Sequence, residues 1–95
     1  MIFIGAPVNF VSRGRPARAA HAISTLSFRA GREELLALGR RIGVRFVRQR
    51  YTAYEHIGLL DNRIERALQA GAVHVDWYRL LDMANAKIRR FGIPR

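Results

Sequence analysis

The chain has 95 residues and a formal charge of +10, with seventeen lysine and arginine residues against seven aspartate and glutamate residues. A chain of this length supports one modest core, so we expect residues 1–95 to form a single domain. The absence of cysteine excludes disulfides, thiolate zinc sites and cysteine nucleophiles, and is typical of a reducing compartment. The apolar N-terminus is broken by Gly5 and Pro7 too early for a signal peptide or a membrane span. We therefore expect a cytoplasmic protein with no membrane partner.

The positive charge comes almost entirely from arginine, since Lys87 is the single lysine. Two explanations are open. A GC-rich genome replaces lysine by arginine through its codon usage, without selection on chemistry. Alternatively, the guanidinium groups recognise anions, because their fork of N–H donors fits phosphate and carboxylate. A domain with a pI above about 9 is typical of nucleic-acid binders, and an acidic protein partner fits equally well.

The first third of the chain predicts two strands separated by a loop. Residues 1–4 are compact, apolar and β-prone, which predicts a strand buried on both faces. Residues 5–16 contain repeated glycine and proline, so we expect a basic surface loop. The alanine-rich residues 17–22 favour a helical turn, and the alternation in residues 23–28 favours a strand.

The middle of the chain predicts a helix, a strand and a polar connection. Residues 31–42 have an apolar stripe at helical spacing, with Glu33 and Glu34 in the expected first turn and Gly43 after the end. We expect Gly39 to let this helix approach a sheet closely. Residues 44–48 then predict a strand, and residues 49–58 a loop rich in polar and aromatic side chains.

The last third predicts a helix, a short buried strand and a final helix. A helix is expected from Asp61 to Gly71, where Asn62 and Glu65 have the spacing of a capping box. Residues 73–75 predict the strand. Asp76 is expected to cap a helix that Gly92 and the following proline end, leaving residues 91–95 as a short tail. Trp77 is expected to be buried on that helix.

Two segments share one order, in which a helix is followed by glycine and a short apolar strand. Such repeated short connections favour βαβ units, because a crossover helix brings parallel strands together. The sequence therefore predicts an α/β fold with a small, mostly parallel sheet of three to four strands covered by about three helices. In such sheets ligands bind at the carboxyl ends of the strands, so loops 5–15 and 49–56 are expected to border any crevice.

Three stretches together carry a family resemblance: ELLALGRRIGV, the tyrosine and histidine loop after it, and the basic helix that leads into AGAVHVDW. These stretches resemble an uncharacterised domain-of-unknown-function family of small phage and bacterial proteins. The resemblance covers residues 1–83 and rests on short, degenerate motifs. It implies a phage or prophage setting in a bacterial host cell and a compact α/β fold, but no activity.

This chain departs from the family at its acidic positions. The family has aspartates just after the first strand, after the HxIx segment, and in a histidine-tyrosine-aspartate group before the basic helix. Here those places hold Gly5 and Ala6, then Thr25, then Glu55 and His56. If relatives use carboxylates to hold a metal or to move protons, this chain has lost most of that set.

No pattern of catalytic residues emerges from the sequence. No pair of histidine, aspartate or glutamate residues has the helical HExxH spacing of a zinc site, so we predict no metal and no cofactor. There is no GxSxG nucleophile motif and no Walker motif, and we assign no catalytic residue. A polar site remains open at His21, Glu55 and His56, because loop side chains can converge for acid–base chemistry.

The leading hypothesis is a non-catalytic phage accessory protein that binds DNA or RNA through phosphate contacts, as monomer or homodimer. Cations interleaved with tyrosines are typical of surfaces that follow a nucleic-acid backbone and stack its bases. The alternatives are a host-targeting counter-defence inhibitor that docks on an acidic host protein, and a degenerate relative of a metal-dependent enzyme such as a nuclease. The predicted binding residues are Arg13, Arg15, Arg18, Arg45, Arg48, Arg50, Tyr51, Tyr54, Arg63 and Arg66.

Overall fold

The fold is built around one long strand, β3 (Arg15–Ser24), which pairs with other strands on both sides. The computed structural model describes residues 1–50, 52 and 54–92. The other strands of the described sheet are β1 (Ile2–Ile4), β2 (Val8–Ser12), β4 (Ile57–Leu60) and β5 (Val73–His74). β1 and β2 follow one another along one side of β3, β4 lies along its other side, and β5 lies outside β1.

The sheet is mixed, which corrects the prediction of a mostly parallel sheet of three to four strands. Every pairing with β3 is antiparallel, and only β1 and β5 run parallel to each other. The crossover connections expected from the repeated helix–glycine–strand order do not dominate, because β1, β2 and β3 are joined by short connections. Short connections of this kind produce antiparallel neighbours. The α/β class itself is confirmed.

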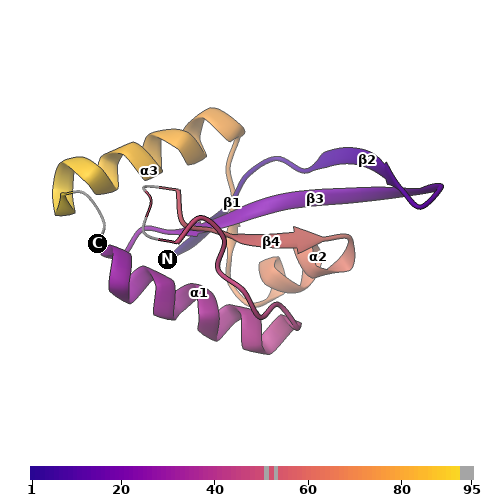
Figure 1. Cartoon of the computed structure of the whole chain (residues 1–95), viewed down its shortest axis with the longest axis horizontal. Helices are drawn as coiled ribbons and strands as arrows, with labels where there is room; N and C mark the ends of the chain where they lie inside the picture. Colours follow the sequence, from indigo (N-terminus) through magenta and orange to yellow (C-terminus); the bar gives the residue numbers. More distant parts are fainter. Residues whose placement is uncertain (51, 53, 93–95) are drawn as a thin grey trace.

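A β-hairpin occupies the region predicted as a basic loop. Residues 8–12 form β2, and only residues 5–7 and the two-residue turn at 13–14 lack strand structure. Arg13 and Gly14 both have positive φ, of 51° and 76°, which is the backbone of the tight hairpin turns that match strand twist. Residues 17–22, predicted as a helical turn, belong to β3. The resulting β2–β3 ribbon extends away from the helices (Figure 1).

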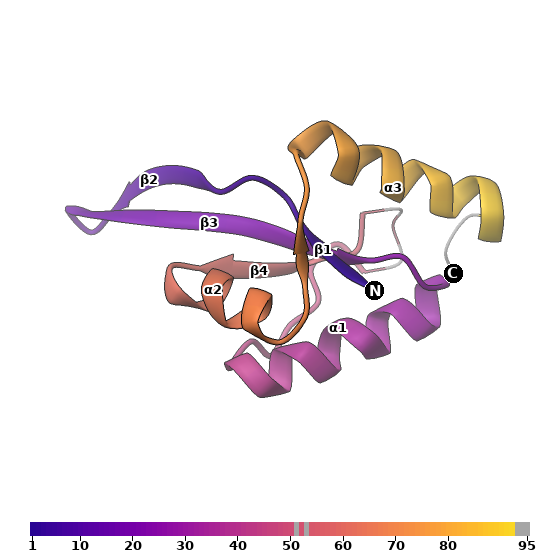
Figure 2. The same ribbon diagram turned by 180° about the vertical axis from the view of Figure 1, so that it is seen from behind.

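Three helices cover the sheet from two sides: α1 (Phe28–Ile42), α2 (Asn62–Gln69) and α3 (Trp77–Phe91). The first two lie on one face, and α3 lies on the opposite face near the chain termini (Figures 1 and 2). The predicted tail at 91–95 begins inside α3, and residues 93–95 are outside the described residues. Among the described residues, no helix is both long enough and apolar enough to cross a membrane.

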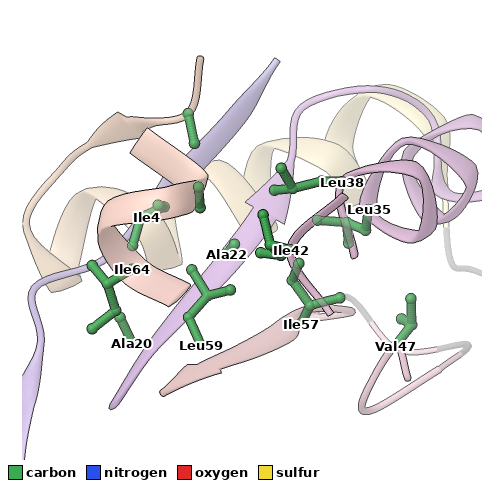
Figure 3. Packing of buried hydrophobic residues seen from close by; sticks show 12 residues of the cluster. Ile4, Ala20, Ala22, Leu35, Leu38, Ile42, Val47, Ile57, Leu59 and Ile64 are labelled. Atoms are coloured by element: carbon green, nitrogen blue, oxygen red, sulfur yellow. The ribbon is translucent and has the colours of Figure 1, made fainter. Parts of the chain in front are cut away.

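The main core lies between the sheet and the helices α1 and α2 (Figure 3). Alternate residues of β3 point into it, as the two-residue period of a strand requires. Its fully buried side chains include Ile4, Leu35, Ile57, Leu59 and Ile64. A second, smaller cluster forms under α3, where Leu80 and Ala84 pack on Ile23. The sheet therefore has one fully covered face and one partly covered face.

Several local predictions need correction. Helix α1 begins at Phe28, so Glu33 and Glu34 are not in its first turn. Residues 44–48 are not a strand, and only Arg48 bridges to His56 on the outer side of β4. Gly39 approaches the backbone of Val44 rather than the sheet, since an added Cβ would lie 2.3 Å from the Val44 carbonyl oxygen.

The predicted capping box does not form, because Asp61 is the N-cap of α2 and Asn62 is already helical. The Asp61 carboxylate instead accepts the backbone N–H of Arg18 at 3.0 Å. The prediction that Asp76 caps α3 is confirmed, since its carboxylate accepts the Arg79 N–H at 2.8 Å. Strand β5 is exposed rather than buried, and Trp77 is 41 % exposed rather than buried.

Candidate functional site

Four arginines lie along the outer side of β4 and the adjoining end of α1. They line three adjoining surface hollows of about 200, 300 and 380 Å³. The first two hollows share Gly58 and Leu60, and the second and third share Gly43. Arg48 lies across Gly58, with its Nε 3.4 Å from where a Cβ on that glycine would be. We call this set the basic edge, and its members are Arg40, Arg45, Arg48 and Arg63.

The basic edge carries no compensating acid. Neither aspartate nor glutamate lines any of its three hollows within the described part of the chain. Acidic side chains are engaged elsewhere: Glu34 with the N-terminal amine, Glu55 with Arg32, and Glu65 with Arg18. These three carboxylates are paired at those places, and within the hollows no described carboxylate lies beside the arginines to balance their charge.

Arg63 has a structural role in addition to its position on the basic edge. Its Nε donates a hydrogen bond of 3.2 Å to the carbonyl oxygen of Ile42, at the C-terminus of α1. Helix C-termini have unsatisfied carbonyl groups and partial negative charge, so a guanidinium stabilises them. Arg63 thereby connects α2 to the end of α1, and its charge is only half-exposed.

The other predicted cations lie apart from the basic edge. Arg13 and Arg15 are exposed at the far end of the β2–β3 ribbon. Arg18 is already paired with Glu65 at 2.6 Å, which lowers the pKa of that carboxyl, and is therefore a poor phosphate ligand. Arg66 and Arg50 are exposed, but neither lines a hollow of the basic edge, and Tyr51 is outside the described residues.

Four rings pack together at the inner end of the uncovered sheet surface. His21 stacks on His56 with ring centroids 4.0 Å apart, and Tyr54 and Trp77 lie 5.7 and 5.8 Å from His21. The Tyr54 hydroxyl shares a hydrogen bond of 3.3 Å with Nδ1 of His21, and Nδ1 of His56 donates to the Tyr54 carbonyl oxygen at 2.9 Å. We call these four residues the ring cluster.

The histidines of the ring cluster are neutral at pH 7. Burial, together with the adjacent His56 and Arg48, lowers the pKa of His21 to about 4. Burial likewise lowers the pKa of His56, helped by Arg48 and opposed by the hydrogen bond to the Tyr54 carbonyl. Burial raises the pKa of the Tyr54 hydroxyl to about 12. The cluster therefore offers uncharged rings, and any anion there must be held by arginine.

The predicted polar site at His21, Glu55 and His56 is divided by the structure. Successive residues of an extended segment point to opposite sides, so Glu55 and His56 face different parts of the molecule. His56 joins the ring cluster, whereas the Glu55 carboxylate accepts a 2.5 Å hydrogen bond from the Arg32 guanidinium in the interior. The structure therefore does not bring these three side chains to one point.

Four residues with notable contacts were not predicted as site residues. Arg40 belongs to the basic edge, Trp77 to the ring cluster, and Arg32 and Lys87 to the interior. Lys87 is buried, with its Nζ 4.8 Å from the Phe28 ring, and burial lowers its pKa. Lys87 follows Leu80 by seven residues and Ala84 by three, so helical periodicity places it on the buried side of α3. The exposed position of Arg40 could have been predicted from its place in the last turn of α1. The ring contacts of Trp77 could not, because they depend on residues far away in sequence.

Within the described residues, no three histidine, aspartate or glutamate side chains are grouped as metal ligands. The arrangement can bind anions along the basic edge and planar groups beside the ring cluster. Comparison of the chain with protein-family models, with curated proteins and with solved structures finds no match. The resemblance to a phage and bacterial family therefore stays a prediction.

Proposed function

We propose that this protein binds nucleic acid through phosphate contacts made by the basic edge, without catalysing a reaction. The observation that carries the proposal is the set of four arginines around adjoining hollows that no described carboxylate lines. Guanidinium groups bind phosphate oxygens through paired N–H donors, and they are the side chains best suited to this geometry.

The charge distribution supports a polyanion rather than a small anion. The arginines lie in an open row along the strand edge and not around one enclosed cavity. The exposed Arg13 and Arg15 add a second positive region at the end of the ribbon. A partner with regularly spaced phosphates engages several such positions at once, and each contact releases condensed counterions. The net charge of +10 also accelerates the encounter with a polyanion.

The experiment measures binding to a labelled duplex and a labelled single strand at several salt concentrations. The logarithm of the binding constant should fall linearly with the logarithm of the salt concentration, with a slope of about −0.9 per phosphate contact for a duplex and about −0.7 for a single strand. The double variant Arg45→Gln/Arg48→Gln should weaken binding and make the slope shallower by roughly one unit per lost contact.

A matched control is Arg89→Gln/Arg90→Gln, which removes the same charge from exposed positions at the end of α3. It should alter the slope much less than the double variant on the basic edge. If neither the duplex nor the single strand binds in a salt-sensitive manner, the proposal is overturned. If a stoichiometric acidic host protein then binds the wild-type chain but not the Arg45/Arg48 variant, the inhibitor hypothesis replaces it.

A further inference from the structure

None of the helices in the described residues lies over one face of the β2–β3 ribbon. Helix α3 covers this side of the sheet only near the termini, and the ribbon extends beyond it in both views (Figures 1 and 2). The register places directly opposite residues on the same face, so this surface follows from the pairing of β2, β3 and β4. We call it the open face, and it comprises Val8, Phe10, Arg15, Ala17, Ala19, His21, Gly58 and Leu60.

The floor of the open face is made of small residues. Ala17 and Ala19 lie along β3, and Gly58 lies opposite His21 on β4. A shallow hollow of about 200 Å³ is lined by Ala19, His21, Gly58 and Leu60 together with Arg48. Because the side chains of Ala17 and Ala19 are short, a flat group can approach the backbone of β3 there, whereas Arg48 lies over Gly58.

Exposed aromatic rings border this floor. Phe10 lies opposite Ala17 and is 39 % exposed, and Trp77 of the ring cluster is 41 % exposed at the inner end. Apolar surface of this kind is expensive to leave in water. Aromatic rings beside a flat floor provide the surface on which unpaired nucleobases stack, and every base has the planar face that stacking needs.

Arginines lie at both ends of the open face. Arg15 is at the outer end of β3, and Arg48 crosses Gly58 at the inner end. The seven residues from Arg15 to His21 span about 20 Å, since the rise is about 3.3 Å for each step between neighbours. Along this length the surface presents Arg15, the Phe10 ring, the hollow and then Arg48. A single strand, in which each base is attached between successive phosphates, can place phosphates on the two arginines and bases on the ring and in the hollow.

We propose that the open face binds single-stranded nucleic acid, with bases stacked on Phe10 and Trp77 and phosphates held by Arg15 and Arg48. This inference rests on the proposed function and names the class of nucleic acid. Bases in a duplex are already stacked and paired, so they do not reach the rings. A second copy of the chain is disfavoured by the repulsion of two charges of +10.

Trp77 is the single tryptophan of the chain, so its fluorescence reports directly on the open face. Titration of the wild-type protein with a 12-nucleotide oligothymidine should change this fluorescence, with the same midpoint as binding measured by a label on the oligonucleotide. The matching duplex should bind more weakly and leave the fluorescence nearly constant. Unchanged fluorescence on saturation with the single strand would overturn the inference.

The variant Phe10→Leu should weaken binding of the single strand by about 5- to 100-fold, which is the usual effect of losing one stacked base. Its affinity for the duplex should change less than twofold. Phe91→Leu is the matched control, because Phe91 is 41 % exposed but lies at the end of α3, away from the open face. It should bind like the wild type, and circular dichroism should show that both variants are folded.

The outcomes separate the two proposals. If neither nucleic acid binds in a salt-dependent manner, the proposed function fails and the inference fails with it. If salt-dependent binding is present but the duplex binds as tightly as the single strand and Phe10→Leu has no effect, only the inference fails. If Phe91→Leu weakens binding as much as Phe10→Leu, the stacking surface is not on the open face.

Discussion

At the scale of single residues, the interior contains a buried ion pair, which differs from the exposed ion pairs on the surface. The Glu55 side chain is 1 % exposed and the Arg32 side chain 12 % exposed, and Lys87 is buried close by. Desolvating such charges costs free energy, and removing one charge of a buried pair is strongly destabilising. This pair therefore affects stability much more than the exposed pair between Arg18 and Glu65.

We predict that Glu55→Gln lowers the free energy of unfolding by about 3–5 kcal/mol, because it removes a buried negative charge that faces the Arg32 and Lys87 cations. The measurement is urea denaturation followed by circular dichroism. Glu65→Gln serves as the reference variant, and it should have a far smaller effect because its carboxylate is exposed. Equal effects of the two substitutions would show that the Arg32–Glu55 contact is not desolvated.

The histidines of the ring cluster predict a pH-dependent stability. The pKa of His21 is about 4 in the folded protein and about 6.5 in the unfolded chain. Between these values the unfolded chain binds a proton that the folded protein does not, so stability is complete above pH 6.5 and falls as the pH approaches 4. The lowered pKa of His56 acts in the same direction. The urea midpoint should therefore be lower at pH 5 than at pH 7.

Substitution of His21 by Asn should reduce this difference between the two midpoints, because one of the two histidines no longer titrates. His74→Asn is the control: its side chain is exposed on β5, outside the ring cluster, and the variant should keep the wild-type difference. Titration of the imidazole protons by nuclear magnetic resonance tests the cause separately. A His21 resonance that titrates near pH 6.5 would contradict the prediction.

At the scale of elements, tertiary pairing overrides local preference in β3. Alanines 17, 19, 20 and 22 favour a helix when only neighbouring residues are considered. In the fold, the same small side chains let β3 hold three neighbouring strands, pack under α1 and α2, and form the floor of the open face. Partners on both sides satisfy the strand backbone, which a local pattern does not reveal.

The C-terminal end of α1 is stabilised by a close contact between Gly39 and the backbone of residues 43 and 44. The Gly39 carbonyl oxygen accepts hydrogen bonds from the N–H groups of Gly43 and Val44, and an added Cβ on Gly39 would collide with the Val44 backbone. We predict that Gly39→Ala destabilises the protein by about 1–3 kcal/mol, as overpacking does, measured by urea denaturation. Helix propensity alone predicts the opposite sign, a gain of about 0.5–1 kcal/mol.

The variant Ala37→Gly provides the reference for propensity in the same helix, since Ala37 is exposed on α1. It should cost about 0.5–1 kcal/mol. A gain in stability from Gly39→Ala would mean that residues 43 and 44 move away without loss of packing.

At the scale of the whole molecule, the two faces of the sheet have different tasks. One face holds the main core under α1 and α2, and the other is covered by α3 only in part (Figure 2). Burial of the first face supplies most of the packing of a small domain. The second face remains free along the ribbon, and the basic edge runs beside it. The division places positive charge and exposed rings next to each other without interrupting the core.

The sequence by itself determined the α/β class, the strand at residues 2–4, the helix that ends at Ile42, the cap at Asp76 and the large positive charge. These features depend on local spacing, on capping chemistry and on composition, all of which are readable along the chain. It also predicted Arg45, Arg48 and Arg63 as binding residues, which stays a prediction, but not that they share one strand edge. Its mostly parallel sheet and its loop at residues 5–16 were wrong.

Only the tertiary structure decided the antiparallel pairing around β3, the separation of Glu55 from the two histidines, and the fact that no described helix covers the open face of the ribbon. Each of these depends on contacts between distant residues, such as Arg32 with Glu55 or His21 with Trp77. The turn at Arg13 and Gly14 lacks the asparagine or aspartate that usually marks such a hairpin, so strand pairing had to supply the information. The faces of β3 acquire their different roles only when helices cover one of them.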